Sequence, residues 1–146
     1  RGLRAGTENV AAIVGFATAL ELARARSAEM GERMLKLREY LRERLSTVGV
    51  QFNGDPEHSL PGLLSATFPG VDAEALVLYL DAEDIQVSSG SACDSDKLET
   101  SQALHAIGLS EADAHSTIRI SLGPETTQGE LDYLLEALPG VLAKLK

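Results

Sequence analysis

The spacing of apolar residues switches several times along this 146-residue chain, between the 3.6-residue period of a helix and the two-residue period of a strand. Helical spacing or helix-end signals mark residues 8–46, 72–81, 100–107, 110–113 and 127–145. Strand-like patterns mark residues 50–53, 64–68, 85–87 and 117–122. Helical segments interleaved with short strands predict an α+β two-layer domain, in which helices pack on one face of a small, largely antiparallel sheet.

The first helical segment carries two apolar stripes. One runs from Val10 to Leu20 and the other from Met30 to Leu45, and we expect both stripes to lie in the core. Gly31 lies at the start of the second stripe, next to Met30, and predicts a break or a bend, since a glycine within a helix costs about 1 kcal/mol relative to alanine. The opposite face is expected to be an ordinary solvated surface, made of Glu32, Arg33, Lys36, Arg38 and Glu39.

Several residues mark the ends of the later helices. Asp72 has the form of an N-cap, and Thr127 with Glu130 matches a capping box, in which each residue supplies a partner for the backbone of the other. Pro139-Gly140 predicts a kink in the last helix, because proline lacks the backbone N–H that a helix interior needs.

Composition and charge argue against several classes of binding partner. A 44% hydrophobic fraction suits one globular domain, and the net charge of −9 argues against nucleic acid and anionic membranes as partners. No segment approaches the roughly 18 apolar residues of a membrane span. A single cysteine suits a reducing compartment, so we expect a cytoplasmic protein. The chain does not begin with methionine, and we expect it to be a piece of a longer polypeptide.

Cys93 is the one strong nucleophile in the chain, and its surroundings are polar. Three serines, a glycine and an alanine precede it, and Asp94, Ser95, Asp96 and Lys97 follow. A thiol on a polar segment after a strand can act as a nucleophile, but the acidic neighbours favour the neutral thiol rather than the reactive thiolate. A functional cysteine and a bystander thiol therefore both remain open on spacing alone.

Arg119 and Thr7 are the other candidate site residues. In the segment 117–122, apolar and polar residues alternate, so Arg119 falls on the polar face of a strand, where its guanidinium can bind a carboxylate through two hydrogen bonds. The alternative is a surface arginine paired with an aspartate. Thr7, in a Gly-Thr turn before a helix, suits a phosphate, and its alternative role is to cap that helix.

The histidines do not form a recognisable metal motif. His58, His105 and His115, taken with Cys93, show no close ligand spacing, so no metal site is assigned.

Three motifs in order resemble the cysteine desulfurases of the NifS/IscS type, which are pyridoxal-phosphate enzymes of the class V aminotransferase fold. They are Arg4-Ala-Gly-Thr7-Glu-Asn9, Ser88-Ser-Gly-Ser-Ala-Cys93 and Ala114-His-Ser-Thr-Ile-Arg119-Ile-Ser-Leu-Gly123. The resemblance covers nearly the whole chain, and it implies that residues 1–146 are the C-terminal small domain of such an enzyme.

The resemblance also implies a reaction and a role for each candidate. With pyridoxal phosphate bound, the Cys93 thiolate would attack the sulfur of L-cysteine, leaving a persulfide on Cys93 as L-alanine departs. Arg119 would bind the substrate carboxylate, and Thr7 would reach the cofactor phosphate of the partner subunit in a homodimer. The persulfide would pass to an iron-sulfur scaffold or a tRNA-thiolation acceptor protein, and Cys93 could serve as a transient iron-sulfur ligand.

Two departures qualify these implications. The cofactor-binding lysine of the family lies upstream of this segment, so the segment alone is expected to be inactive. Asp94 and Asp96 also stand where small or hydroxyl residues are expected. Two other functions remain open: a selenocysteine lyase of the same class, and a non-enzymatic sulfur-relay or docking module that uses Cys93 and an acidic surface to bind a basic partner.

Overall fold

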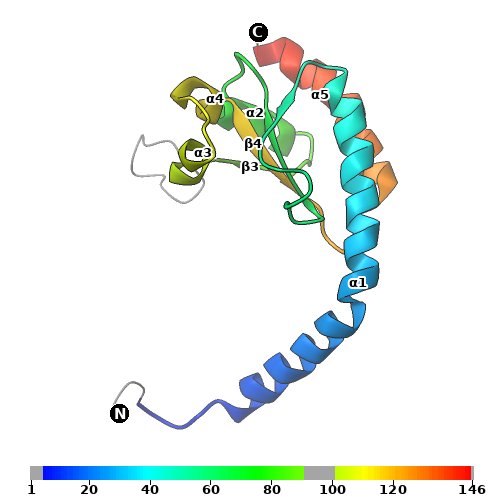
Figure 1. Ribbon diagram of the computed structural model, residues 1–146, viewed down its shortest axis with the longest axis vertical. Coiled ribbons are helices and arrows are strands. Elements are labelled where there is room, and N and C mark those ends of the chain that lie inside the picture. The colour runs from blue at the N-terminus through cyan, green and yellow to red at the C-terminus, as the bar shows by residue number, and fades with distance from the viewer. Residues whose placement is uncertain (1–4, 91–100, 146) are drawn as a thin grey trace.

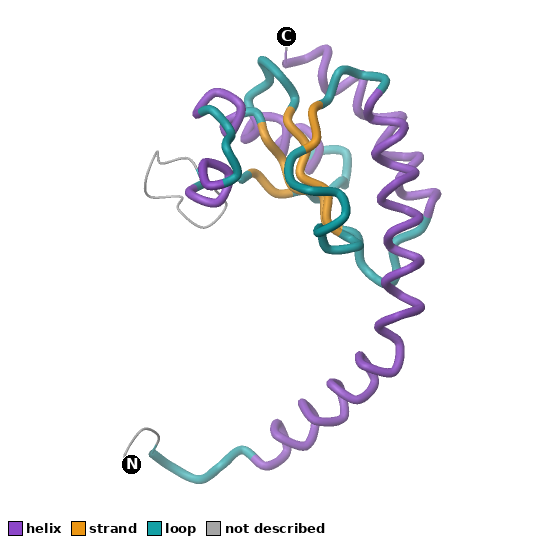
Figure 2. The backbone as a smooth tube through the Cα atoms, in the orientation of Figure 1, coloured by secondary structure: helices purple, strands orange, loops and turns teal. Residues whose placement is uncertain are grey.

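The computed structural model describes residues 5–90 and 101–145, which form helices and a four-stranded antiparallel sheet (Figures 1 and 2). The elements in chain order are α1 (Val10–Ser46), β1 (Gln51–Phe52), β2 (Leu63–Thr67), α2 (Ala73–Asp81), β3 (Ser88–Ser89), α3 (Gln102–Ala106), α4 (Glu111–His115), β4 (Thr117–Ser121) and α5 (Gln128–Leu145). The strand order is β1-β2-β4-β3. The predicted α+β architecture with a small antiparallel sheet is confirmed.

The centre of the sheet is the pairing of β2 with β4. Leu64 lies opposite Ile120 and Ala66 opposite Ile118, and all four side chains are buried in the core. Because side chains alternate across a strand, the residues between them face the other side of the sheet. The predicted alternation in the segment 117–122 is confirmed for Ile118, Arg119 and Ile120, whereas Thr117 is buried as well.

Three helical segments cover the core face of the sheet. The buried leucines of α2 and α5 and of the C-terminal part of α1 pack together on it; they are Leu76, Leu80, Leu134, Leu138, Leu41 and Leu45. The predicted caps are confirmed. Asp72 accepts a hydrogen bond from the Ala75 N–H at 2.7 Å, and Glu130 accepts one from the Thr127 N–H at 2.7 Å.

The N-terminal part of α1 departs from the prediction that both of its apolar stripes are buried. Val10 and Phe16 are 64% and 71% exposed, and Ile13, Val14 and Leu20 are exposed too. Figure 1 shows the reason, since this part of the helix projects away from the sheet and meets no other described element. The prediction is correct for the second stripe, whose Leu41 and Leu45 are fully buried.

α1 also runs through Gly31 as one 37-residue helix, so the predicted break is absent, while the helix is visibly bowed in Figure 1. Within the described residues no helix, α1 included, is both long enough and apolar enough to cross a bilayer. The last helix is likewise continuous through Pro139. Leu138 and Val141, on either side of this proline, are buried and anchor both parts of α5 to the same core.

The sequence predicts the third strand over 85–87, whereas in the structure this strand, β3, begins directly after that range, at Ser88–Ser89. Ile85 and Val87 are partly buried against the core but do not pair with β4. Ser88 and Ser89 pair instead with Arg119 and Ile118. The apolar residues that suggested a strand are therefore core contacts of the segment that leads into one.

Side chains of α1 hold the C-terminal helix and the loop that precedes it. The Tyr40 hydroxyl donates a hydrogen bond to Asp132 Oδ1, and this bond raises the pKa of Tyr40 above its usual value. Arg33 donates to the carbonyl oxygens of Pro124 and, at 2.6 Å, Thr126. These contacts keep α5 alongside the C-terminal part of α1.

The packing of α2 gives a direct test of the core. We expect Leu76→Ala to lower the free energy of unfolding by about 2–5 kcal/mol, because Leu76 is fully buried and the substitution leaves a cavity. Leu78→Ala in the same helix is the matched control, since Leu78 is 69% exposed. Urea unfolding of both variants measures the difference. Equal losses would contradict the assignment of α2 to the core.

Candidate functional site

Arg119 lies in the middle of β4, on the face of the sheet opposite the core. Its strand neighbours are Ser65 on β2 and Ser88 on β3. The side chain is exposed, and its guanidinium makes no hydrogen bond or ion pair with any residue in 5–90 or 101–145. The alternative of an ion pair with an aspartate is therefore not seen in the described part of the chain. A rigid strand presents this charge for an external anion.

A hollow of about 290 Å³ opens beside Arg119. It is lined by Asn53, Gly54, Ser59, Leu63, Ser65, Gly90, Ser101, Ala103, Leu104, Ile107, Thr117 and Arg119. One wall comes from the loop between β1 and β2, the floor from the strands, and the far wall from α3. A volume of this order accommodates a small molecule, and a single cationic group within it sets the orientation of a bound carboxylate.

A hydrogen-bonded network of neutral side chains, which the motifs in the sequence do not predict, forms part of this floor. Asn53 Nδ2 donates to the hydroxyls of Thr67 at 2.8 Å and Ser65 at 3.3 Å. Thr67 and Thr117 share a hydrogen bond at 2.7 Å, and Thr117 donates to the Asp113 carbonyl at 2.6 Å. The one sequence feature that points to this network is the alternation in β2, where Ser65 and Thr67 occupy every second position. Because these groups satisfy one another, they hold the floor rigid around Arg119.

Cys93 lies outside the described residues. Its nearest described neighbours in sequence are Gly90 and Ser101, and both line the hollow beside Arg119. Gly90 passes so close to α3 that a Cβ there would lie 2.6 Å from Leu104 Cδ1. A side chain at this position would therefore force Leu104 to move.

The β1–β2 loop, residues 53–62, is held by a turn around Asp55. The Asp55 carboxylate accepts a hydrogen bond from the Glu57 N–H at 2.8 Å and contacts the His58 ring nitrogen Nδ1 at 2.7 Å. The His58 contact and then the Glu57 N–H lower the pKa of Asp55 below its usual value. The turn presents Ser59 and Gly54 to the hollow.

Thr7 belongs to the segment that precedes α1, and this segment lies far from the sheet in Figure 1. Its side chain is exposed, and it is not the helix cap, because Asn9 Oδ1 accepts the hydrogen bond from the Ala12 N–H at 3.1 Å. The capping alternative for Thr7 is thus wrong, and its hydroxyl makes no hydrogen bond within the described chain. Thr7 and Arg119 are not brought together within one copy of this chain.

No three His, Cys, Asp or Glu side chains gather at a metal-binding distance in the ranges that the structure covers. His58 is engaged with Asp55 at the tip of the loop. Of the lysines that are described, Lys36 lies in α1 and Lys144 in α5, where it contacts Glu83 at 3.7 Å. Neither lysine lines the hollow beside Arg119.

Comparison with protein families identifies the group to which this arrangement belongs. Residues 1–134 match the family described as aminotransferase class V. The chain belongs to the class V aminotransferase family. The family resemblance found in the sequence is confirmed, and it extends over almost the whole chain.

Two cysteine desulfurases are among the relatives that match the whole chain. The chain is 46% identical over 149 residues to cysteine desulfurase IscS of Anaeromyxobacter sp.. This match covers 100% of the chain and 36% of the relative. The chain is 40% identical over 147 residues to cysteine desulfurase IscS 1 of Archaeoglobus fulgidus. This second match covers 100% of the chain and 38% of the relative. This chain therefore spans little more than a third of the length of these relatives.

Solved structures agree with the class V aminotransferase assignment. A NifS-like protein superposes with a TM-score of 0.86 at 36% identity, over 99% of this chain and 36% of that protein. A NifS-like protein from Rickettsia africae superposes with a TM-score of 0.82 at 32% identity, over 97% of this chain and 37% of that protein. The arrangement of α1, the sheet and α5 is thus an arrangement found in NifS-like proteins.

Class V aminotransferases depend on pyridoxal phosphate, the cofactor that the sequence resemblance implies. The described residues fit part of its site. The hollow beside Arg119 offers a guanidinium, hydroxyls and an amide, but no amine for covalent attachment of the cofactor. A guanidinium and hydroxyls can bind a carboxylate, and the exposed hydroxyl of Thr7 can donate to a phosphate.

The hydrogen bonds to Asp55 favour its ionised carboxylate, so the stability of the loop next to the hollow is expected to depend on pH. Because the pKa of Asp55 is lower in the folded chain, its contribution to stability is present above the unfolded value near 3.8 and is lost as the pH falls through the folded pKa. We expect His58→Ala to raise the pKa of Asp55 toward 3.8, as followed by NMR titration of the Asp55 carboxyl. His115→Ala is the control and should leave it unchanged. An unchanged pKa in His58→Ala would contradict the described turn.

Proposed function

We propose that the full-length protein containing this chain is a cysteine desulfurase, which converts L-cysteine to L-alanine and leaves a persulfide on Cys93. The observation that carries this proposal is the exposed Arg119, which has no hydrogen-bond or ion-pair partner among residues 5–90 and 101–145. It lies in a hollow that is also lined by Gly90 and Ser101, the residues flanking the Cys93 segment. The cysteine desulfurases among the relatives, at 40–46% identity, support it. On this proposal residues 1–146 form the C-terminal small domain.

Arg119 is proposed to bind the substrate carboxylate. A guanidinium on a central strand is held by pairing on both sides, so its position changes little when an anion binds. The Thr67 and Thr117 hydroxyls are hydrogen-bonded to each other, and Arg119 is the one Arg or Lys among the described residues that line the hollow, so its charge is the main attraction for an anion there. Bidentate pairing would fix both the position and the rotation of the amino acid.

Cys93 is proposed as the nucleophile and persulfide carrier. Gly90 lies at the edge of the hollow, and three residues span at most about 11 Å, so the chain length allows the thiol to reach a substrate bound at Arg119. When bound, pyridoxal phosphate supplies the electron sink that lets the carbon–sulfur bond of the substrate break. The Cys93 thiolate forms the new sulfur–sulfur bond as that bond breaks, and the electron pair passes to the carbon fragment that becomes alanine.

Thr7 is proposed to bind the cofactor phosphate of a partner subunit. The segment before α1 lies far from the sheet that carries Arg119, so the two residues do not serve one site within a single copy (Figure 1). Its hydroxyl, free of partners in the described residues, suits a phosphate oxygen. A homodimer in which each site takes Thr7 from one subunit and Arg119 from the other accounts for this separation.

The persulfide is proposed to pass to an acceptor protein in the cytoplasm. The single cysteine suits a reducing compartment, and a net charge of −9 favours a basic partner surface. An iron-sulfur scaffold or a tRNA-thiolation protein is the proposed acceptor, with Cys93 as a transient ligand in the first case.

Replacement of Cys93 tests the nucleophile. In the full-length protein loaded with pyridoxal phosphate, Cys93→Ala is expected to abolish alanine and sulfide formation from L-cysteine, because the variant lacks the nucleophile that is proposed to accept the sulfur. The visible absorbance of the bound cofactor should be unchanged, which serves as the control for folding. Substantial alanine formation by this variant would overturn the assignment, and preferential turnover of selenocysteine by the wild type would favour a selenocysteine lyase.

Replacement of Arg119 tests carboxylate binding. Arg119→Ala is expected to raise KM for L-cysteine about 10- to 100-fold, which corresponds to the ~1.5–3 kcal/mol contributed by hydrogen bonds to a charged group. Arg44→Ala is the control, since Arg44 is an exposed arginine of α1, on the core side of the sheet. Steady-state kinetics of alanine formation provides both values. An unchanged KM in Arg119→Ala would contradict the proposed role.

A further inference from the structure

Arg38 in α1 is a buried cation, although the sequence pattern predicted a solvated position. It is 4% exposed, whereas Glu39 and Lys36 in the same helix are exposed as expected. A buried charge is tolerated only when its donors are satisfied. Arg38 is therefore fixed by specific contacts rather than by water.

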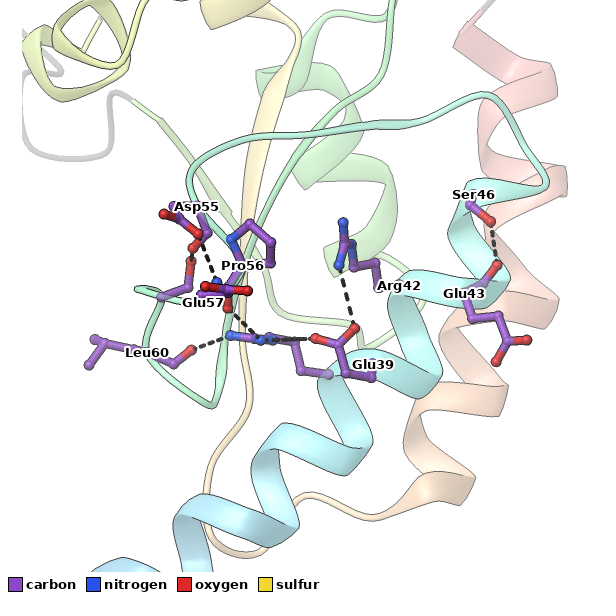
Figure 3. Close-up of polar contacts among 10 residues, drawn as sticks. Glu39, Arg42, Glu43, Ser46, Asp55, Pro56, Glu57 and Leu60 are labelled. Carbon is purple, nitrogen blue, oxygen red and sulfur yellow. Dashed lines mark hydrogen bonds and ion pairs between the residues drawn. The ribbon is translucent and has the colours of Figure 1, made fainter.

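The contacts of Arg38 reach the β1–β2 loop. Its guanidinium donates from Nη1 to the Leu60 carbonyl at 3.0 Å and from Nη2 to the Pro56 carbonyl at 3.3 Å. It also donates from Nε and Nη2 to Glu39 Oε1, at 3.1 and 2.9 Å. Figure 3 shows Pro56 and Leu60 on the loop facing Glu39 across this set of hydrogen bonds. One planar group thus ties two carbonyls of the loop to α1.

The same loop separates Arg38 from the hollow beside Arg119. A smaller hollow, of about 50 Å³, lies on the Arg38 side, and the two hollows share Asn53, Gly54 and Ser59 among their lining residues. The loop is therefore a thin wall, held by Arg38 from one side and facing the site on the other.

The C-terminal end of the loop, at Gly62, is packed too closely against its neighbours to move freely. A Cβ at Gly62 would lie 2.5 Å from the Leu122 carbonyl oxygen and 2.9 Å from Met34 Sδ. The Gly62 carbonyl accepts a hydrogen bond from the Leu122 N–H at 2.7 Å. With this end fixed against β4 and α1, the Arg38 hydrogen bonds determine where the remainder of the loop lies.

We propose that Arg38 is a positioning residue for the Arg119 site: it holds the loop 53–62 against α1 so that the loop forms the wall against which the amino-acid substrate binds. This inference rests on the proposed function for its substrate. Arg38 does not touch that substrate. Its effect passes through the carbonyls of Pro56 and Leu60 to the wall residues Asn53, Gly54 and Ser59.

The test uses the full-length protein loaded with pyridoxal phosphate and compares Arg38→Met with Arg42→Met. Arg42 is the matched control, because it lies one helical turn further along α1, is more exposed, and contacts Glu39 and the Phe52 ring instead of the loop carbonyls. Arg38→Met is expected to raise KM for L-cysteine about tenfold with a much smaller change in kcat, because the wall orients the substrate without touching the reacting atoms. The affinity for the product L-alanine, followed by cofactor absorbance, should fall by a similar factor.

A second readout follows the loop itself. The His58 N–H donates to the Asp55 carbonyl and the Leu63 N–H to the Leu60 carbonyl, so hydrogen exchange at these two amides reports whether the loop holds its form. Exchange at both should be faster in Arg38→Met and unchanged in Arg42→Met. Arg38→Lys keeps the charge and one donor group, and should fall between the wild type and Arg38→Met in both readouts.

The outcomes separate the two proposals. All measurements are made well below the unfolding midpoint of each variant, and Arg38→Lys carries the test if Arg38→Met does not fold. A lower midpoint with unchanged KM and unchanged exchange would overturn the positioning role and leave Arg38 as a structural residue only. An equal rise in KM in Arg42→Met would overturn it as well. If the wild type forms no alanine from L-cysteine, the proposed function itself fails, whereas hydrogen exchange still decides whether Arg38 holds the loop.

Discussion

The register between β2 and β4 is the constraint on which the rest of the structure depends. Ile118 and Ile120 must face the core, and the residue between them must then face the opposite side. A slip of one residue would bury the Arg119 guanidinium and expose both isoleucines. The hydrophobic effect therefore positions the cation of the site, although no apolar contact of Arg119 itself is needed.

The long helix α1 connects the core with the site. Leu41 and Leu45 pack under the sheet, and Tyr40 and Arg33 hold α5 and the loop before it. Arg38, on the adjacent face of the same helical turns, reaches the β1–β2 loop. A single helix thus fixes the core, the C-terminal helix and one wall of the hollow. Its exposed N-terminal part projects away from the sheet, and the segment that contains Thr7 precedes it (Figure 1).

Local patterns in the sequence predicted those features that depend on neighbouring residues. The alternation around Arg119 predicted a strand, and Asp72 and Thr127 predicted helix starts, because side-chain period and capping are properties of a few consecutive residues. The same patterns failed where the outcome depends on distant segments. Ile85 and Val87 look like a strand, but they serve the core. The stripe from Val10 to Leu20 requires a partner surface that the pattern cannot locate.

Arg38 and Asn53 show the same limit within the site. Arg38 is one of several charged residues in a helical segment, and only the fold reveals that the loop 53–62 returns to cover it. Asn53 follows a two-residue strand, and its partners Ser65 and Thr67 come more than ten positions later. Arg119, Cys93 and Thr7 could be selected from sequence because each stands in a motif with a recognisable chemical purpose. The roles of Arg119, Cys93 and Thr7 in the reaction are proposals.

The most direct test of the central claim is to locate the sulfur atom after one turnover. The full-length protein loaded with pyridoxal phosphate would be mixed with one equivalent of L-cysteine, digested under non-reducing conditions and analysed by peptide mass spectrometry. The account predicts one added sulfur atom on the peptide that contains Cys93, together with one equivalent of L-alanine. Alanine formed with the sulfur on another residue, or with no sulfur retained on the protein at any time, would contradict it.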